Sequence, residues 1–183
     1  MRNKPYNKYK YVQASKFTYS FLGHTDYKSP DDRRELEADL KKEHFLAKDG
    51  RILRKPGIEP VTPLQRNRYQ GHVYVLTSGW TYSGGAEFSS LMREHTNAVF
   101  VGEEAGGGYY GNTSGYSIEL NLPVTGIMID IPILKFVLDV TNKAPLGRGV
   151  IPDHEIQPNI KEFLEGRDAV MEFSRQLTEG KKK

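Results

Sequence analysis

The stretch HVYVLTSGWTYSGGAEFSSLMREHTNAVFVG, residues 72–102, decides the fold class. It opens with a short apolar, β-branched run at 72–77, which is typical of a strand buried on both faces. Residues with helical spacing follow, among them Ala86, Phe88 and Leu91, and a second buried run occupies 98–102. Strand, helix and strand within about thirty residues make a βαβ unit. The sequence therefore predicts an α/β fold with two parallel strands and a right-handed crossover.

Segments outside this unit predict further elements. SPDDRRELEADLKKEHFLAKDG (29–50) indicates a surface helix capped by Ser29 or Asp31, with a thin apolar stripe that includes Leu36 and Leu40. The runs YSIELNL and GIMIDIPIL alternate around PVT as a hairpin does. Strands are expected at 135–140 and 147–158, and a closing helix at 167–177. We expect residues 1–70 to form a peripheral lead-in and 71–183 to form the core.

Composition excludes several kinds of site. The chain has 183 residues, 37% of them hydrophobic and 27% charged, which is typical of a globular protein. It has no cysteine, which excludes disulfides, thiolate zinc sites and a cysteine nucleophile. No apolar run approaches the roughly 20 residues of a membrane span, so we expect no integral membrane segment.

Nucleic acid, metal and cofactor binding are not expected. Lysines alternate with tyrosines in the basic first sixteen residues, which we interpret as a polar edge strand rather than a nucleic-acid surface. The glycine-rich loop 102–115 lacks the ending of a P-loop and the spacing of a dinucleotide fingerprint. No histidine has metal-ligand spacing, and we interpret all five as structural: His24, His44, His72, His95 and His154.

Ser83 lies at the corner between the first strand and the helix of the βαβ unit, directly before Gly84 and Gly85. A serine in this place could simply cap the helix. It could also be a nucleophile, because the corner exposes the hydroxyl and the start of the helix offers oriented amides to a developing oxyanion. The residues by themselves leave both readings open.

Several motifs in order resemble the tail-specific (carboxy-terminal processing) proteases and their tricorn-core relatives. The stretches that carry the resemblance are Leu76 with Thr77, 81–83, Glu87 with Phe88, 101–103, 106–108 and 149–153. The resemblance covers residues 70–158 well and the first seventy only loosely. It implies a crotonase-like (ClpP-like) spiral of βαβ units that lacks its N-terminal portion, with residues 71–183 as the core of the catalytic domain.

The resemblance also implies a serine-type endopeptidase that hydrolyses peptide bonds of a polypeptide substrate. It implies that Ser83 is the nucleophile and the Gly84 amide an oxyanion-hole donor. The glycine-rich loop is then expected to border the substrate cleft; its candidate substrate-binding residues are Gly107, Gly108, Tyr109 and Tyr110. A location outside the cytoplasm, in a bacterial envelope or periplasm, follows from the resemblance alone.

The general base is missing from the pattern. Members with a serine–lysine dyad would have the lysine at position 108, where this chain has Gly108. Other members carry a histidine before an Asp-x-Arg-x-Asn-x-Gly-Gly segment, and neither occurs in these 183 residues. We therefore expect a missing N-terminal portion to supply the base and the isolated chain to be inactive. The alternatives are a non-catalytic module that binds a peptide or apolar ligand on the same fold, and an α/β domain of another hydrolase.

Overall fold

The structure, a computed structural model, describes residues 5–180, which fall into two compact units. The first contains Pro5, 63–110 and 140–180, and the second contains 6–62 and 111–139. This division differs from the boundary expected at residue 70. The reason is strand pairing, because strands from the first seventy residues pair with strands from 111–139 inside the second unit.

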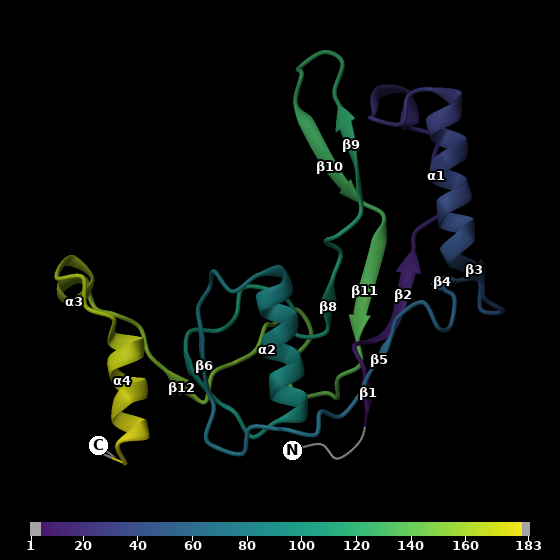
Figure 1. Cartoon of the computed structure of the whole chain (residues 1–183). Helices are drawn as coiled ribbons and strands as arrows, with labels where there is room; N and C mark the ends of the chain where they lie inside the picture. The colour runs from purple at the N-terminus through teal and green to yellow at the C-terminus, as the bar shows by residue number, and fades with distance from the viewer. Residues whose placement is uncertain (1–4, 181–183) are drawn as a thin grey trace. The chain divides into compact units, whose positions relative to one another are not determined.

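The first unit is built on the predicted βαβ unit, which the structure confirms. Strand β6 runs parallel to β7, with Tyr74 opposite Val99 and Thr77 opposite Gly102. Helix α2 (Figure 1) lies between these two strands in the sequence. A third parallel strand, β12, pairs with the other side of β7, so the strand order is β12-β7-β6. The elements of this unit are β6 (Tyr74–Thr77), α2 (Ser83–His95), β7 (Val99–Gly102), β12 (His154–Glu155), α3 (Ile160–Leu164) and α4 (Ala169–Thr178).

The core of the first unit gathers around β7. Phe100 and Val101 of this strand are fully buried, and Phe100 packs in a cluster with Tyr109 and Val150. On α2 the buried residues are Glu87 and three small ones, Ala86, Ser89 and Ser90, and the hydroxyls of the two serines donate hydrogen bonds to carbonyls four residues earlier. The sequence predicted the closing helix, α4, but not the short helix α3 before it.

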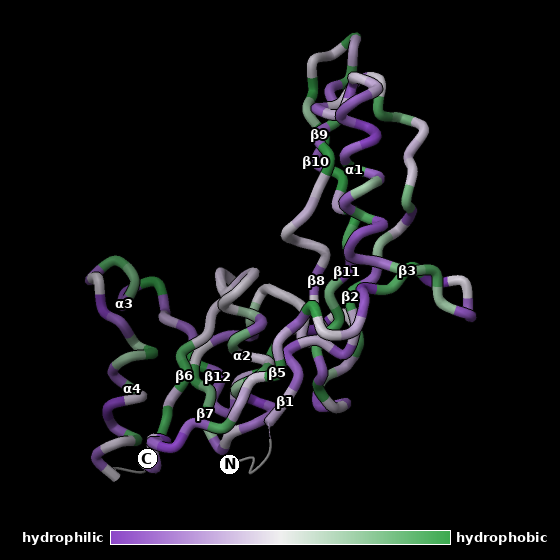
Figure 2. Tube along the Cα trace, turned by 45° about the vertical axis from the view of Figure 1, so that its right-hand side comes forward, coloured by the Kyte–Doolittle hydropathy of each residue, from purple (hydrophilic) through white to green (hydrophobic). Residues whose placement is uncertain are grey.

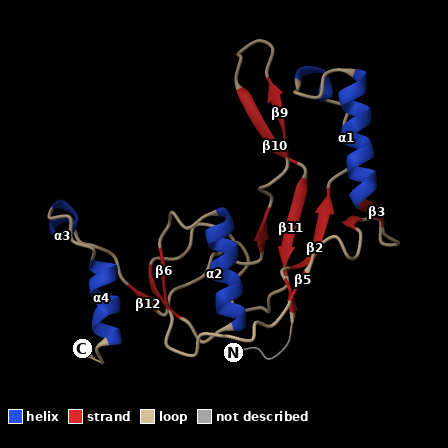
Figure 3. Ribbon diagram, in the orientation of Figure 1, coloured by secondary structure: helices blue, strands red, loops and turns tan. Residues whose placement is uncertain are grey.

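The second unit contains most of the strands. Its elements are β1 (Tyr6–Asn7), β2 (Tyr9–Ala14), the 3-10 helix η1 (Leu22–His24), α1 (Pro30–Glu43), β3 (His44–Leu46), β4 (Ile52–Arg54), β5 (Val61–Thr62), β8 (Gly111–Asn112), β9 (Ser117–Asn121), β10 (Met128–Pro132) and β11 (Leu134–Leu138). The predicted hairpin is β9 with β10, antiparallel, with Met128 opposite Asn121 (Figure 3). The predicted strand at 135–140 is β11.

The basic N-terminal segment is not an edge strand, which corrects the expectation from its composition. β2 lies in the middle of a five-stranded sheet of order β3-β4-β2-β11-β8, paired on one side with β4 and on the other with β11. Val12 and Ala14 of this strand are buried, while Lys10, earlier in the same strand, is exposed. Val12 and Ala14 give this strand an apolar face that packs in the core of the unit.

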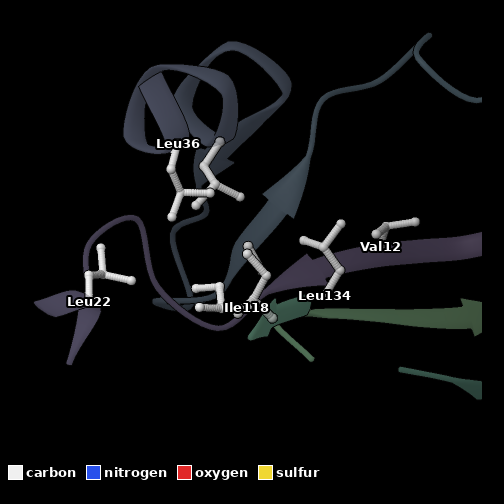
Figure 4. Close-up of a cluster of buried hydrophobic side chains, with 8 residues drawn as sticks. Val12, Leu22, Leu36, Ile118 and Leu134 are labelled. Atoms are coloured by element: carbon white, nitrogen blue, oxygen red, sulfur yellow. The ribbon is translucent and has the colours of Figure 1, made fainter. Parts of the chain in front are cut away.

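Both ends of the second unit's sequence contribute to one core. Its buried cluster joins side chains from β2, η1, α1, β9, β11 and the residue between β10 and β11 (Figure 4): Val12, Ala14, Leu22, Leu36, Leu40, Ile118, Ile133 and Leu134. The first seventy residues therefore supply much of a hydrophobic core. The expectation that residues 1–70 form only a peripheral lead-in did not include this core. Hydrophilic residues predominate along α1 (Figure 2), yet its thin apolar stripe, Leu36 and Leu40, is fully used.

Helix α1 begins where the sequence predicted, directly after Ser29. Ser29 caps the helix, and its side chain and that of Asp32 bond each other's backbone amides in a capping box. The helix ends at Glu43, earlier than its predicted limit, because 44–46 pair as β3 with β4. No helix within residues 5–180 combines the length and apolar character that a membrane crossing requires.

Candidate active site

Ser83 is the first residue of α2, at the end of the loop 78–82 that follows β6. Its φ is 48°, and within residues 5–180 it is the one non-glycine residue with positive φ. The left-handed conformation costs a residue with a Cβ roughly 1–2 kcal/mol, so the surrounding structure must impose it. The predicted strand-to-helix corner is confirmed, and it is strained at the serine.

The capping alternative for Ser83 is wrong. The N-cap of α2 is Tyr82, and no side chain caps this helix end. Ser83 is exposed, and its hydroxyl has no hydrogen-bond partner in the part of the chain that the structure describes. Hydrogen bonding by the Ser83 hydroxyl therefore does not explain the strained backbone of this residue.

Free amides surround the serine at the start of the helix. The amides of Gly85 and Ala86 make the first bonds, to the carbonyl oxygen of Tyr82 at 2.9 and 3.3 Å. The amides of Ser83 and Gly84 come earlier, where a helix has no acceptor for them. A Cβ placed on Gly84 would meet nothing within 4 Å, and the first turn carries no acid. This helix end can therefore donate to a negatively charged oxygen.

The loop before Ser83 is held by its own hydroxyl groups. Thr81 accepts a hydrogen bond from the Ser78 amide at 3.0 Å through its hydroxyl, and its own amide donates to the Ser78 carbonyl at 2.9 Å. The amide of Gly79 donates to the carboxylate of Glu103 at 3.2 Å. The loop is therefore a closed turn tied to the end of β7.

The glycine-rich loop after β7 packs directly on this turn. A Cβ on Gly106 would lie 2.1 Å from the carbonyl oxygen of Gly79, and a Cβ on Gly107 would lie 2.4 Å from the Cβ of Ala86. The amide of Gly107 donates to the carbonyl of Thr81 at 3.0 Å. These glycines thus allow two loops to approach at backbone distance. Gly108, the next residue, is exposed.

The two tyrosines of this loop have structural surroundings. Tyr109 is only 1% exposed and packs in the core of the first unit, so its ring is not available to a substrate, which corrects the expectation. Burial raises its pKa to about 12. Tyr110 is half-buried and stacks edge-on against Tyr109 at 5.0 Å, and its hydroxyl donates to Asn142 and to the carbonyl of Ala144.

Acidic side chains anchor the glycine-rich loop and its neighbour. Glu104 accepts hydrogen bonds from Arg148 Nε at 2.8 Å and from the Gly149 amide at 2.8 Å, and these bonds lower its pKa. The amide of Ala105 donates to the Val150 carbonyl at 3.0 Å. Together these contacts hold the segment 148–150 against the loop that borders the serine corner.

Asp153 joins α2 to β7. Arg93 of α2 donates two hydrogen bonds to its carboxylate, at 2.8 and 3.0 Å, and the amide of Phe100 donates a third at 2.8 Å. Burial alone would raise the pKa of Asp153, but the bonds from Arg93 and Phe100 outweigh it, and the pKa lies below its ordinary value.

The structure assigns no base to Ser83. His95 ends α2, and at 1.5 Å per residue the two ends of this helix lie about 18 Å apart. The ring of His154 packs against Phe173, with centroids 5.3 Å apart. Within the described residues no group of three His, Asp or Glu side chains could hold a metal ion.

Sequence reasoning missed how the corner is held in place. Thr81, Glu103 and Gly107 do so together; all three belong to motifs that the sequence displayed, but the motifs did not show that these residues contact one another. The Thr-x-Ser spacing was the available signal, since a hydroxyl two residues before the serine can close a turn.

Comparisons with known proteins identify the family of the chain. The family model described as "Peptidase family S41" matches residues 8–156, so the chain belongs to peptidase family S41. A crystal structure from Parabacteroides merdae, provisionally described as a peptidase, is similar to it at 24% identity with a TM-score of 0.47. The match covers 63% of this chain, which spans about a third (34%) of the length of that one.

Proposed function

We propose that this chain carries the nucleophile of a serine-type peptidase, with Ser83 as that nucleophile. The observation that carries the proposal is the conformation of Ser83, an exposed serine held at φ 48° on the N-terminal end of a helix. Strain of this kind is characteristic of a serine that must project from a strand-to-helix turn. Membership in peptidase family S41 supports the same assignment. We further propose a crotonase-like spiral as the wider fold.

In the proposed reaction a base removes the proton of Ser83 Oγ, and Oγ attacks the carbonyl carbon of a peptide bond. The tetrahedral oxyanion accepts a hydrogen bond from the amide of Gly84, and its collapse expels the leaving peptide, whose amine takes up the proton that the base removed. Water then hydrolyses the acyl-enzyme and restores the hydroxyl. The base is proposed to come from a segment of the protease that is not among these 183 residues.

The proposed substrates are polypeptides, including their carboxy-terminal tails. Beside the serine, Trp80 is 85% exposed and Tyr82 is also exposed, with their rings edge to face at 6.3 Å. Exposed aromatic rings supply apolar contact area at little conformational cost, as peptide-binding surfaces need. A site of action outside the cytoplasm is part of the proposal and rests on the family resemblance.

Two observations favour a second candidate, a non-catalytic module that binds a peptide or an apolar ligand. Position 108 is glycine, and the Ser83 hydroxyl has no partner within residues 5–180. A domain that kept the exposed aromatic residues but lost the base would show the same features. The two candidates differ in whether Ser83 is needed for turnover.

The experiment compares the protein in its complete natural reading frame with its Ser83→Ala variant on unfolded casein. Loss of a catalytic nucleophile lowers kcat by about a million-fold, so the variant should be inactive. Ser20→Ala, at an exposed serine of the second unit, is the control and should retain full activity. Cleavage that survives Ser83→Ala refutes the nucleophile. A wild-type protein that binds casein without cutting it supports the binding module.

A further inference from the structure

The hairpin of β9 and β10 leaves one strand edge open in the second unit (Figure 3). In the described part of the chain β10 pairs only with β9, whereas the other edge of β9 is contacted through the bridge from Thr25 to Leu120. The register of the hairpin is regular from Met128 opposite Asn121 to Pro132 opposite Ser117. The outer edge of β10 is therefore a regular strand edge without a neighbour inside residues 5–180.

Backbone groups of Met128 and Asp130 point outward along this edge. In an antiparallel pair, alternate residues bond the partner strand, and the residues between them direct their N–H and C=O groups away from it. The amide of Leu122 donates to the carbonyl oxygen of Ile127 at 2.9 Å, so Ile127 belongs to the set that bonds β9. Counting by two along the regular register leaves Met128 and Asp130 facing outward, on exposed residues.

The edge lacks most of the features that keep exposed strand edges from pairing. Natural sheets protect an edge with lysine, proline, a bulge or a covering segment. β10 contains no lysine, and its one proline, Pro132, is its last residue. Met128 is 61% exposed and Ile129 is 39% exposed, so apolar side chains are accessible on both faces of the strand. Such an edge can accept an added strand, whose backbone supplies the missing hydrogen bonds.

Two carboxylates indicate the charge of that added strand. Glu119 and Asp130 are directly opposite each other in the hairpin, both are exposed, and their side chains share one face. Like charges in this arrangement are destabilising. Neither carboxylate forms an ion pair within residues 5–180. A lysine or arginine of an added strand, placed opposite Asp130, would lie on the same face and offset the repulsion between the two carboxylates.

A second copy of this chain does not meet the same charge requirement. Antiparallel pairing of two β10 edges is a two-fold arrangement in which each copy presents the same surface to the other. It would place Glu119 and Asp130 of both copies on one face of a four-stranded sheet, so the repulsion would increase. Charge complementarity therefore favours a basic segment of a different polypeptide.

We propose that the outer edge of β10 binds an extended polypeptide segment as an additional antiparallel strand, with a lysine or arginine opposite Asp130. The backbone N–H and C=O of that basic residue bond the C=O and N–H of Asp130. The residues on either side of it direct their side chains to the other face, where they contact Ile129 and Ile131. This surface is independent of the proposed peptidase function, because the hairpin belongs to the second unit and Ser83 to the first.

Titration of the ¹⁵N-labelled 183-residue chain with the peptide acetyl-Thr-Val-Lys-Val-Thr-amide tests the proposal. We expect saturable shifts of the Met128 and Asp130 amide signals, with a Kd on the order of 1 mM. The same peptide with glutamate in place of lysine should bind about fivefold more weakly. A peptide methylated on the backbone nitrogen of its lysine keeps the charge but loses the hydrogen bond to the Asp130 carbonyl, and should produce no saturable shift.

Asp130→Lys reverses the charge at the edge and should exchange the preference, so that the glutamate peptide binds about fivefold more tightly than the lysine peptide. Glu35→Lys, at an exposed position of α1, makes the same change of charge in the same unit and should bind both peptides as the wild type does. Amide spectra that are unchanged away from the substituted residue show that each variant is folded.

The proposal is overturned by shifts that stay linear up to about 10 mM peptide, by equal binding of the lysine and glutamate peptides, or by binding of the N-methylated peptide. An Asp130→Lys variant that keeps the wild-type preference also overturns it. So do Met128 and Asp130 signals that move with protein concentration in the absence of peptide, because the edge would then pair with a second copy.

Discussion

The amide of Gly107 donates a hydrogen bond to the carbonyl oxygen of Thr81, 3.0 Å away, and so joins the loop after β7 to the segment that ends at Ser83. The same glycine lies against Ala86, on the first turn of α2. Gly107 therefore contacts the corner on both sides of Ser83, at Thr81 before it and at Ala86 after it. This explains how a strained serine keeps its conformation although its own side chain is unbound.

Gly107→Ala should destabilise the protein. The new Cβ would lie 2.4 Å from that of Ala86, and overpacking of this kind costs about 1–3 kcal/mol of unfolding free energy. Urea unfolding measures the loss. Gly84→Ala is the control, because its Cβ meets nothing within 4 Å, and it should leave stability unchanged or raise it by up to about 1 kcal/mol.

Replacing Ala86 by glycine in the Gly107→Ala background should restore part of the loss, because it removes the atom that the new methyl group meets. A Gly107→Ala variant as stable as the wild type would show that the two loops do not approach as closely as described.

Ser83→Gly should be more stable than Ser83→Ala by roughly 1 kcal/mol. Both variants lack the hydroxyl, but only glycine adopts φ 48° without a steric cost. Chemical denaturation of the pair measures the difference directly. Equal stability of the two variants would mean that the corner is not strained, and would remove the main support for the proposed nucleophile.

The 183-residue polypeptide by itself should fold but not measurably cleave casein. It offers Ser83 without a lysine at position 108, and removing one member of a catalytic unit costs about a million-fold in kcat. A fluorophosphonate probe, followed by intact-mass measurement, should label it weakly or not at all. Robust proteolysis that disappears in Ser83→Ala would show that a histidine of this chain, or of a neighbouring copy, is the base.

Acid should weaken the link between α2 and β7. The pKa of Asp153 is lowered in the folded protein, so its contribution is present above the unfolded value, near 3.8, and is lost as pH falls through the folded value. Asp153→Asn should therefore reduce the fall in stability with pH below about 4. Glu155→Gln, which removes an exposed carboxylate on β12, is the control and should show the same dependence of stability on pH as the wild type.

Unfolding midpoints measured between about pH 2 and 5 give the slope of stability against pH for the wild type and for Asp153→Asn. If Asp153→Asn followed the wild-type slope throughout, the carboxylate would not be stabilised in the folded state by Arg93 and Phe100.

The sequence by itself determined the βαβ unit, because buried strands and an amphipathic helix leave distinct local periods. Residues 72–102 form it as expected, and Ser29 caps α1 as its position before Pro30 and Asp32 predicts. The same local chemistry placed Ser83 at the corner. What these features share is that each depends on residues only a few positions apart.

Only the tertiary structure decided how distant segments combine. Alternation in β2 shows a face that can be buried, but not that β11, more than a hundred residues later, pairs beside it. The burial of Tyr109 and the contact of Gly107 with Ala86 likewise depend on neighbours far along the chain. Such contacts are selected by the packing of complete elements, and short-range sequence patterns carry no record of them.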